Sequence, residues 1–549
     1  MTMYPPGESE RAGRDSDHFD GEGYAQFMET TVKRGATAPA RAELDSGTAD
    51  RRQSWFPGWL LALERAVTSV TTSEWAFGAL LTFCVIYFIM PLGSNDQSRW
   101  DMVYALIHGT AIIDQHAHNT IDISLYHGHY YSPRTIGLSI VATPVLWLLG
   151  HVVSLDQPAT ISYTRQVYIL DLFTVFPAAI AVALFFRRFI ARLRPELAKS
   201  PLPYVAAGAF ALATLEYPYS EFFISHVYGG ALLFIAFYLL YRARSVENTA
   251  PWLIVAGLLA GLGVITEYLA ALIAAILCGY ILLAFTASWA TRIKSLALFV
   301  AGTLPSVAIL GWYNWFAFGN PFYMSYGFVV GQQFQKGQHT GFFGLTLPTP
   351  GNIWEILVYP RGLLMESPWL ILLPLGFYFW YRSGRARLEA LVAILSSVIY
   401  ILAVASYFLP MGGDYVVGPR LLVPVLPFLC LGLAWMIDDS RLWLRGLFTA
   451  TLGFSLLITF FYVVGGVRLV PGWSAYPVKE LFIPLLLHGR VPIIDGYTPD
   501  NLGARLLHLP QMVSTNLLGL VLLLWFYVAA KALLRYRPPQ TGRAQPGAG

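Results

Sequence analysis

The sequence contains few charged residues and few cysteines. Asp, Glu, Lys and Arg make up only 12% of the 549 residues, whereas 56% are hydrophobic and the mean hydropathy is +0.54. This balance excludes an ordinary soluble globular domain. The three cysteines, Cys84, Cys278 and Cys430, all fall inside apolar runs, so the sequence carries neither a disulfide framework nor a cysteine metal motif. The small net charge of +4 gives no sign of a nucleic-acid partner.

Apolar runs recur along the chain. A candidate transmembrane helix needs about 20 predominantly apolar residues. We count about thirteen apolar runs of roughly that kind, and we therefore expect an all-α integral membrane protein. The runs are 74–92, 136–153, 166–186, 202–217, 222–241, 252–266, 268–287, 295–315, 369–382, 390–409, 420–437, 446–466 and 514–534.

The first 72 residues differ from the rest because they are polar and mix both charge signs. A segment of this composition cannot bury enough apolar surface to fold alone. It also lacks the basic region, apolar core and cleavage site of a signal peptide. We predict a disordered cytoplasmic tail over 1–72, with an interfacial helix near 54–70 that leads into the first span.

The charges of the connecting loops predict the topology. Lys and Arg concentrate in cytoplasmic loops near span ends. Basic and weakly charged connections alternate along this chain only if one early run, 136–153, does not cross the membrane. This interpretation gives about twelve crossings with both ends in the cytoplasm; the alternative is that 136–153 spans normally. The resulting regions are 73–466 as the catalytic part, 467–513 as an outer loop, and 514–549 as the last span with a short tail.

The loop after the first run gathers charged and aromatic residues. It contains Asp96, Arg99, Asp122, Tyr131 and Arg134, together with five histidines. Charged groups at the edge of hydrocarbon indicate a functional site. Asp96 can act as a general base towards an acceptor hydroxyl, and the two arginines suit a phosphate. A surface ion pair between Asp96 and Arg99, and ordinary interfacial packing of the tyrosines, are the alternatives.

The second outer loop carries Glu216, Glu221 and His226 among several aromatic residues. Two carboxylates and a histidine could hold a divalent cation or orient a sugar hydroxyl, so a divalent cation stays open as a cofactor. An aromatic belt with its charges turned to water is the alternative. Glu267, between two apolar runs, marks either a short outer turn or a buried acid that faces the bundle. The HAH and HGH spacings of the first loop are not a recognised zinc pattern.

The sequence lacks a nucleotide-binding glycine loop. GDYVVGPR (413–420) contains two glycines but has no strand–turn–helix context. We interpret it as a turn that carries Arg420 to the outer surface. A nucleotide-sugar donor is therefore not indicated.

Several motifs together resemble a known family. These are NDQSR (95–99), ALIHGTAIID (105–114), DISLYHGHYYSPRTIGLSIVATPV (122–145), TLEYPYSEFF (214–223), FGNPF (318–322), YPRGLLMESPWL (359–370) and GDYVVGPRLLVPVLPFL (413–429). The order and wording of these elements resemble the GT-C class of membrane glycosyltransferases, and more narrowly the bacterial relatives of protein mannosyltransferases and of the lipid A aminoarabinose transferase (glycosyltransferase family 39).

The resemblance implies a fold and a reaction. Such enzymes have interfacial helices in the first outer loop and then a helical bundle. They move a hexosyl or pentosyl group from a polyprenyl phosphate to a protein, glycan or lipid acceptor at the outer face of the plasma or inner membrane. Asp96 matches the expected base, and Arg134 matches a basic position of the family motif, although the prolines around it are missing. Arg99, Arg361 and Arg420 are further candidates to contact the donor phosphate.

The competing class is a carrier, such as a lipid-linked sugar flippase or another multi-pass transporter. Many secondary transporters also have twelve crossings with both ends inside. They usually contain internal repeats and charged or broken helices near the midplane. We find no repeat between the halves of this chain, and its polar residues gather in outer loops of unequal length. The sequence therefore favours a transferase.

Overall fold

The computed structural model describes residues 71–155, 161–286, 288–413, 417–465, 474–488 and 500–536. Four predictions lie wholly or partly outside these residues: the tail over 1–72, the interfacial helix near 54–70, the outer loop 467–513, and the short tail at the end of 514–549. Everything below concerns the part that begins at Thr72, which forms a single compact unit.

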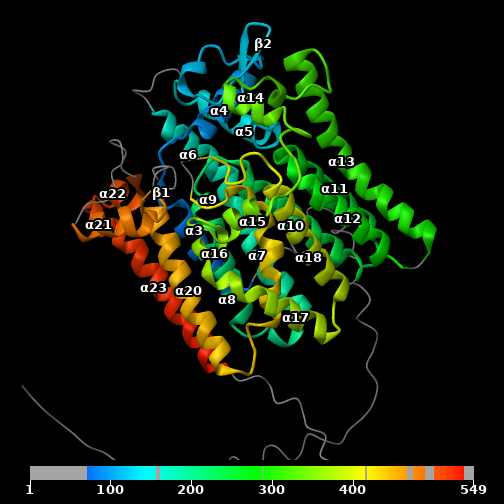
Figure 1. The fold of residues 1–549 in the computed structure, drawn as a ribbon, viewed down its shortest axis with the longest axis vertical. Helices are drawn as coiled ribbons and strands as arrows, with labels where there is room; N and C mark the ends of the chain where they lie inside the picture. Colours follow the sequence, from blue (N-terminus) through cyan, green and yellow to red (C-terminus); the bar gives the residue numbers. More distant parts are fainter. Residues whose placement is uncertain are drawn as a thin grey trace, which may run out of the picture. The chain divides into compact units, whose positions relative to one another are not determined.

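Each of the thirteen predicted apolar runs contains helical structure (Figure 1). The long helices are α3 (Thr72–Ile86), α5 (Ile136–Gly150), α6 (Tyr163–Phe173), α7 (Val175–Leu193), α8 (Leu202–Leu212), α10 (Ser225–Ala243), α11 (Ala250–Thr266), α12 (Ala271–Ala284), α13 (Trp289–Phe318), α17 (Leu373–Ser383), α18 (Arg387–Ala405), α20 (Leu442–Gly465) and α23 (Gln511–Arg535).

The run 420–437 is the exception to regular α-helix. It consists of η6 (Arg420–Val425), α19 (Leu426–Leu429) and η7 (Cys430–Trp435). Pro424 and Pro427 lack the backbone N–H that a regular helix needs, which accounts for the succession of short turns. All three pieces are almost entirely buried among the surrounding helices.

Six stretches within the described residues are long and apolar enough to cross a membrane by themselves. They are α6 with α7, α10, α13, α18, α20 and α23. Helix α5 has only 15 residues, about 22 Å at the usual rise, whereas the hydrocarbon layer is about 30 Å thick. The chain is thus built as a membrane protein. The count of twelve crossings, and the interpretation of 136–153 as a non-crossing segment, stay predictions.

Small residues bring some helices unusually close together. A Cβ atom at Gly257 of α11 would lie 1.9 Å from the carbonyl oxygen of Phe299 on α13. A Cβ at Gly302 of α13 would lie 2.2 Å from the carbonyl oxygen of Ile254. Since neither position has room for a side chain, the two backbones pack directly against each other, as small residues allow in membrane helix pairs. Elsewhere α20 and α23 also lie side by side (Figure 1).

The first loop folds into a helix and a hairpin. Helix α4 (Ser94–Ile107) packs against α5, and η1 (Ala117–Asn119) follows it. Strands β2 (Ser124–Tyr126) and β3 (His129–Tyr131) pair in antiparallel register, with Leu125 opposite Tyr130. Both turn residues, His127 and Gly128, have positive φ angles of 49° and 85°, as a two-residue hairpin turn of this kind requires.

A second pair of strands joins distant parts of the chain. Strand β1 (Phe88–Ile89), directly after α3, pairs with β4 (Asp500–Asn501). The structure thereby adds two short sheets to a fold expected to be all-helical. The remaining short elements are η2 (Pro195–Leu197), α9 (Glu216–Tyr219), η3 (Tyr268–Ala270), η4 (Ser325–Phe328), α14 (Gln332–Gln338), α15 (Pro350–Leu357), α16 (Leu363–Glu366), η5 (Pro368–Leu372), η9 (Val478–Phe482), α21 (Ile483–Leu487) and α22 (Leu502–Leu506).

Candidate active site

Asp96 lies in the first turn of α4 and is 1% exposed. Its Oδ2 accepts a hydrogen bond of 3.0 Å from the backbone N–H of Gly93. The N-terminus of a helix favours a negative charge, so the carboxylate is both held in place and stabilised there. The predicted base is therefore a buried acid in a fixed position and not a loop side chain facing water.

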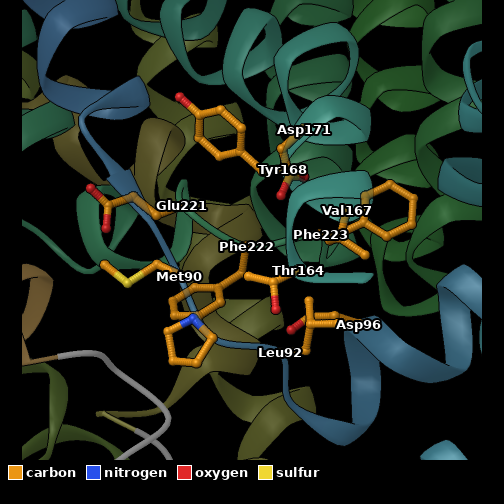
Figure 2. A pocket seen from close by; sticks show the side chains of 11 residues that line it. Met90, Leu92, Asp96, Thr164, Val167, Tyr168, Asp171, Glu221, Phe222 and Phe223 are labelled. Atoms are coloured by element: carbon orange, nitrogen blue, oxygen red, sulfur yellow. The ribbon is translucent and has the colours of Figure 1, made fainter. Parts of the chain in front are cut away.

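Asp96 lines a pocket with two other acids (Figure 2). The acids are Asp171 of α6 and Glu221, which follows α9. The pocket is small and partly open to solvent. We call it the acid pocket, and its other lining residues are Met90, Pro91, Leu92, Thr164, Val167, Tyr168, Phe222 and Phe223.

The structure separates the two acids Glu216 and Glu221. Glu221 lines the acid pocket, and both of its carboxylate oxygens are buried without a hydrogen-bond partner among the described residues. Burial raises the pKa of Glu221 well above its ordinary value. Glu216 is also buried, and burial likewise raises its pKa, but it does not line this pocket. Of these two acids, Glu221 is thus the one that shares a pocket with Asp96.

Sequence reasoning did not single out Asp171. It is 3% exposed and lies on the long apolar stretch formed by α6 and α7. Within the sequence it is an acid inside a predicted span, and such a residue is by default a candidate for function. That signal was present in the run 166–186, which we counted only for its hydrophobicity.

Arg99 follows Asp96 by three residues on the same helix, so the two side chains leave neighbouring positions of one face. The guanidinium is 1% exposed and donates to Asn95 Oδ1 at 3.1 Å and to the carbonyl oxygen of Thr135 at 3.0 Å. Burial and the nearby charge of Arg134 lower the pKa of Arg99 to about 10. The alternative of a surface ion pair between Asp96 and Arg99 does not fit the structure, because both residues are buried.

Arg134 forms an ion pair with Asp122, so these two predicted residues are direct neighbours. Burial lowers the pKa of Arg134, but the charge of Asp122 outweighs it and the net shift is upward. Tyr326 of η4 lies within electrostatic reach of Arg134, Arg99 and Glu267. These contacts bring the arginines of the first loop towards the end of α11.

His226, which is buried, and Glu267, which is partly buried, form a pair at the same place. The Nδ1 atom of His226 lies 2.8 Å from Glu267 Oε2, and the Ser225 hydroxyl donates to the same oxygen at 3.0 Å. Burial by itself raises the pKa of Glu267. The contact with His226 acts in the opposite direction and outweighs it, so the net shift is downward. Glu267 lies in the short connection between α11 and η3 and is partly buried there, so both sequence interpretations of this residue stay open.

The charges of Arg99 and Arg420 act on His226. Arg420 itself donates to the carbonyl oxygen of Gly412. We refer to Arg99, Arg134, Arg420 and His226, with their partners Asp122 and Glu267, as the cationic cluster. Four of the predicted residues that are far apart in sequence therefore meet around the end of α11.

Arg361 and Tyr131 are placed differently. The Nε atom of Arg361 donates to the carbonyl oxygen of Ser474 at 2.8 Å, near Glu366. Tyr131 is 6% exposed and packs in a small hydrophobic cluster with Phe318. Substrate contact by these two residues stays a prediction.

Metal binding was left open by the sequence. In the part of the chain that the structure describes, no group of three or more His, Cys, Asp or Glu side chains is arranged to hold a metal ion. Asp114 and His129 of the first loop instead bond to each other at 2.8 Å. Partial burial raises the pKa of Asp114, but the backbone N–H of Tyr130 and the His129 ring lower it, and the net shift is downward.

Comparison with protein-family models finds no match, and neither does comparison with curated proteins. Among solved structures the chain is similar to ArnT from Cupriavidus metallidurans bound to undecaprenyl phosphate, with 15% identity, 86% of this chain and 77% of that chain covered, and a TM-score of 0.45. It is also similar to the archaeal oligosaccharyltransferase AglB from Archaeoglobus fulgidus in complex with an inhibitory peptide and a dolichol-phosphate. That match has 13% identity, 71% and 54% coverage, and a TM-score of 0.44.

Both neighbours are GT-C glycosyltransferases, the class that the sequence motifs resemble. The chain spans only about half the length of AglB. At identities of 15% or less and TM-scores below 0.5 the likeness is distant. Any functional conclusion therefore has to come from the residues of this chain.

Proposed function

We propose that this protein is a membrane glycosyltransferase that moves a sugar from a polyprenyl-phosphate donor to an acceptor at the outer face of the plasma or inner membrane. The observation that carries the proposal is helix α4. Its first turn holds Asp96 in the acid pocket, and three residues later it places Arg99 in the cationic cluster. A base for the acceptor and positive charge for the leaving phosphate are the two requirements of this reaction, and here they share one helix.

Asp96 takes the proton of the acceptor hydroxyl as its oxygen bonds to the anomeric carbon of the donor sugar. The bond between that carbon and the phosphate oxygen breaks, and polyprenyl phosphate leaves with both electrons of that bond. Charge that develops on a leaving group is stabilised by cations fixed beforehand in a water-poor site. Arg134 and Arg420 supply hydrogen-bond donors for the phosphate, whereas Arg99, bound to Thr135, contributes mainly through its charge.

Glu221 has a different role from Asp96 because its surroundings differ. Its buried carboxyl group, with a raised pKa, holds its proton at a higher pH than an exposed glutamate. It can therefore donate a hydrogen bond to a hydroxyl or ring oxygen of the sugar. A carboxyl group that its surroundings keep protonated, so that it can donate a hydrogen bond, is a recurrent arrangement in enzyme sites.

The experiment is transfer from a polyprenyl-phosphate sugar by the purified protein in detergent. Asp96→Asn keeps the shape of the side chain and removes the base, so we expect transfer to fall by about a hundredfold or more. Asp114→Asn is the matched control, because Asp114 is an exposed acid of the same loop. Near-normal turnover in Asp96→Asn, or an equal loss in both variants, would contradict the assignment.

A further inference from the structure

A second cavity lies directly beside the acid pocket. It is lined by Leu92, Gln97, Trp100, Asp101, Asn119 and Tyr163 and is partly open to solvent. Leu92 lines both cavities. Asp96 and Asp101 lie five residues apart on α4.

Asp101 is the unusual residue of this cavity. It is 1% exposed, and its Oδ2 is buried without a hydrogen-bond partner among the described residues. Its Oδ1 accepts only a long bond of 3.3 Å, from Asn119 Nδ2. A buried polar atom that lacks a partner costs free energy unless a ligand or water satisfies it. Burial raises the pKa of Asp101 to about 8, against a weaker opposing effect of Asn119.

The remaining lining groups complete a chemical pattern. Gln97 and Asn119 are partly exposed carboxamides, which can both donate to and accept from hydroxyl groups. Trp100 and Tyr163 lie against each other, with ring centroids 4.7 Å apart, and form an apolar wall. The indole N–H of Trp100 is already bonded to Gln166 at 3.1 Å, so this residue offers the cavity its apolar surface and no donor.

We propose that this cavity is a subsite for one sugar unit, whose hydroxyl groups bond to Asp101 and Asn119 and whose apolar face packs against Tyr163. Carboxylate and carboxamide groups beside aromatic rings provide the mixture of polar and apolar contacts that a sugar ring requires. The inference rests on the proposed function in one respect, because the sugar then belongs to either the donor or the acceptor of that reaction. The subsite itself needs no catalysis to be detected.

The test is hydrogen–deuterium exchange of the full-length protein in detergent, with a panel of methyl glycosides as probes. We expect slower exchange in the peptides that cover α4 and η1 for at least one glycoside. Asp101→Asn removes an acceptor without changing the shape, and Asn119→Ala removes the carboxamide from a partly exposed turn. Each should weaken the apparent affinity about tenfold or more, as loss of a hydrogen bond to a buried or charged group does. His118→Ala, an exposed neighbour on the same turn, should leave it unchanged.

A second arm identifies the source of the sugar. If the donor sugar occupies the subsite, a polyprenyl-phosphate sugar protects the same peptides and polyprenyl phosphate alone does not. If the acceptor occupies it, a glycoside still protects when the donor is bound. Absence of protection by every glycoside and by the donor, or equal protection in Asp101→Asn, Asn119→Ala and the unaltered protein, overturns the subsite.

Failure of the subsite and failure of the proposed function are distinguishable. A protein that transfers sugar normally but shows no glycoside protection lacks the subsite and keeps the function. A protein that shows specific protection, lost in Asp101→Asn, without any transfer from polyprenyl-phosphate sugars has the subsite but a different reaction.

Discussion

Glu267 Oε2 lies 2.8 Å from His226 Nδ1 and joins the end of α11 to the start of α10. The pair stands close to the positive charges of Arg99 and Arg420. If the Glu267 carboxylate were absent, His226 would lie beside the positive charges of Arg99 and Arg420 with no negative charge from Glu267 to balance them. Glu267 therefore stabilises a region that the proposed reaction needs to be positively charged.

Removing one partner of this pair should be costly. We expect Glu267→Gln to destabilise the protein by about 1–3 kcal/mol, the range for leaving a buried polar group without its partner, and to lower the melting temperature in detergent. The double variant Glu267→Gln with His226→Gln should lose much less than the sum of the single variants, because the two amides can bond to each other. A double-mutant cycle of thermal unfolding measures this coupling. Additive losses would show that the two residues are not coupled.

Glu221 should destabilise the folded protein as the pH rises. Its folded-state pKa lies above the ordinary value of 4.5, so the folded state keeps a proton that the unfolded state has lost. Stability contributed by this proton is present below about pH 4.5 and is lost progressively above it. Glu221→Gln has no proton to lose. It should be as stable as the unaltered protein at low pH and more stable at neutral and alkaline pH, with the difference growing as the pH rises.

The same variant should keep most of its transfer activity, because the glutamine NH2 group can also donate a hydrogen bond to the sugar. Thermal unfolding between acid and mildly alkaline pH, together with transfer assays, measures both effects. A variant that is less stable at every pH would contradict the assignment of a protonated, unpartnered Glu221. Glu366→Gln is a useful comparison. Burial raises the pKa of Glu366 to about 7, but its carboxylate is bonded to the Tyr462 hydroxyl at 2.8 Å.

Some of this site could be predicted from sequence and some could not. The helices follow from long apolar runs, which need no knowledge of packing. Asp96, Arg99 and Arg134 were recognisable because they stand together in one polar loop next to an apolar run. The choice between Glu216 and Glu221 depends on the direction of the chain around α9, and sequence does not give that direction.

Contacts between distant segments were also beyond the sequence. A Cβ atom at Gly137 of α5 would lie 2.2 Å from Thr266 Oγ1, so the start of α5 packs directly against the end of α11. This close approach brings Arg134 and Arg99 towards Glu267. Nothing in either segment alone indicates that approach, and Glu267 was therefore left between two interpretations. Asp171 is not among the predicted site residues, because the run 166–186 is counted only for its hydrophobicity.

Arg134 and Arg420 should govern use of the lipid donor. We expect Arg134→Ala and Arg420→Ala to raise the apparent KM for a polyprenyl-phosphate sugar, to lower kcat, or both. Each substitution removes a side chain that donates hydrogen bonds to the phosphate of the lipid. Lysine at either position should rescue only in part, since the planar fork of the guanidinium is lost. Arg441→Ala is the control, because Arg441 pairs with Asp439 at a partly exposed site. Unchanged donor kinetics with a lower melting temperature would show that the arginines serve as anchors only.

The topology can be tested with single cysteines in a variant that lacks Cys84, Cys278 and Cys430. We expect an impermeant thiol reagent to label cysteines at Gln115 and Lys336 from outside, and to leave cysteines at Lys199, Ser383 and Ser440 unlabelled in intact cells. All five positions are exposed in the structure, so lack of labelling would report location and not burial.

The deciding position for the early run is His151, the exposed residue that follows α5. If 136–153 does not cross the membrane, His151→Cys is labelled from outside, together with Gln115→Cys. The short length of α5, its Pro144 and its buried first turns against α4 and α11 favour this outcome. Labelling of His151→Cys only after permeabilisation would mean that α5 spans, that the loop charges break the positive-inside rule once, and that the count of twelve crossings is wrong.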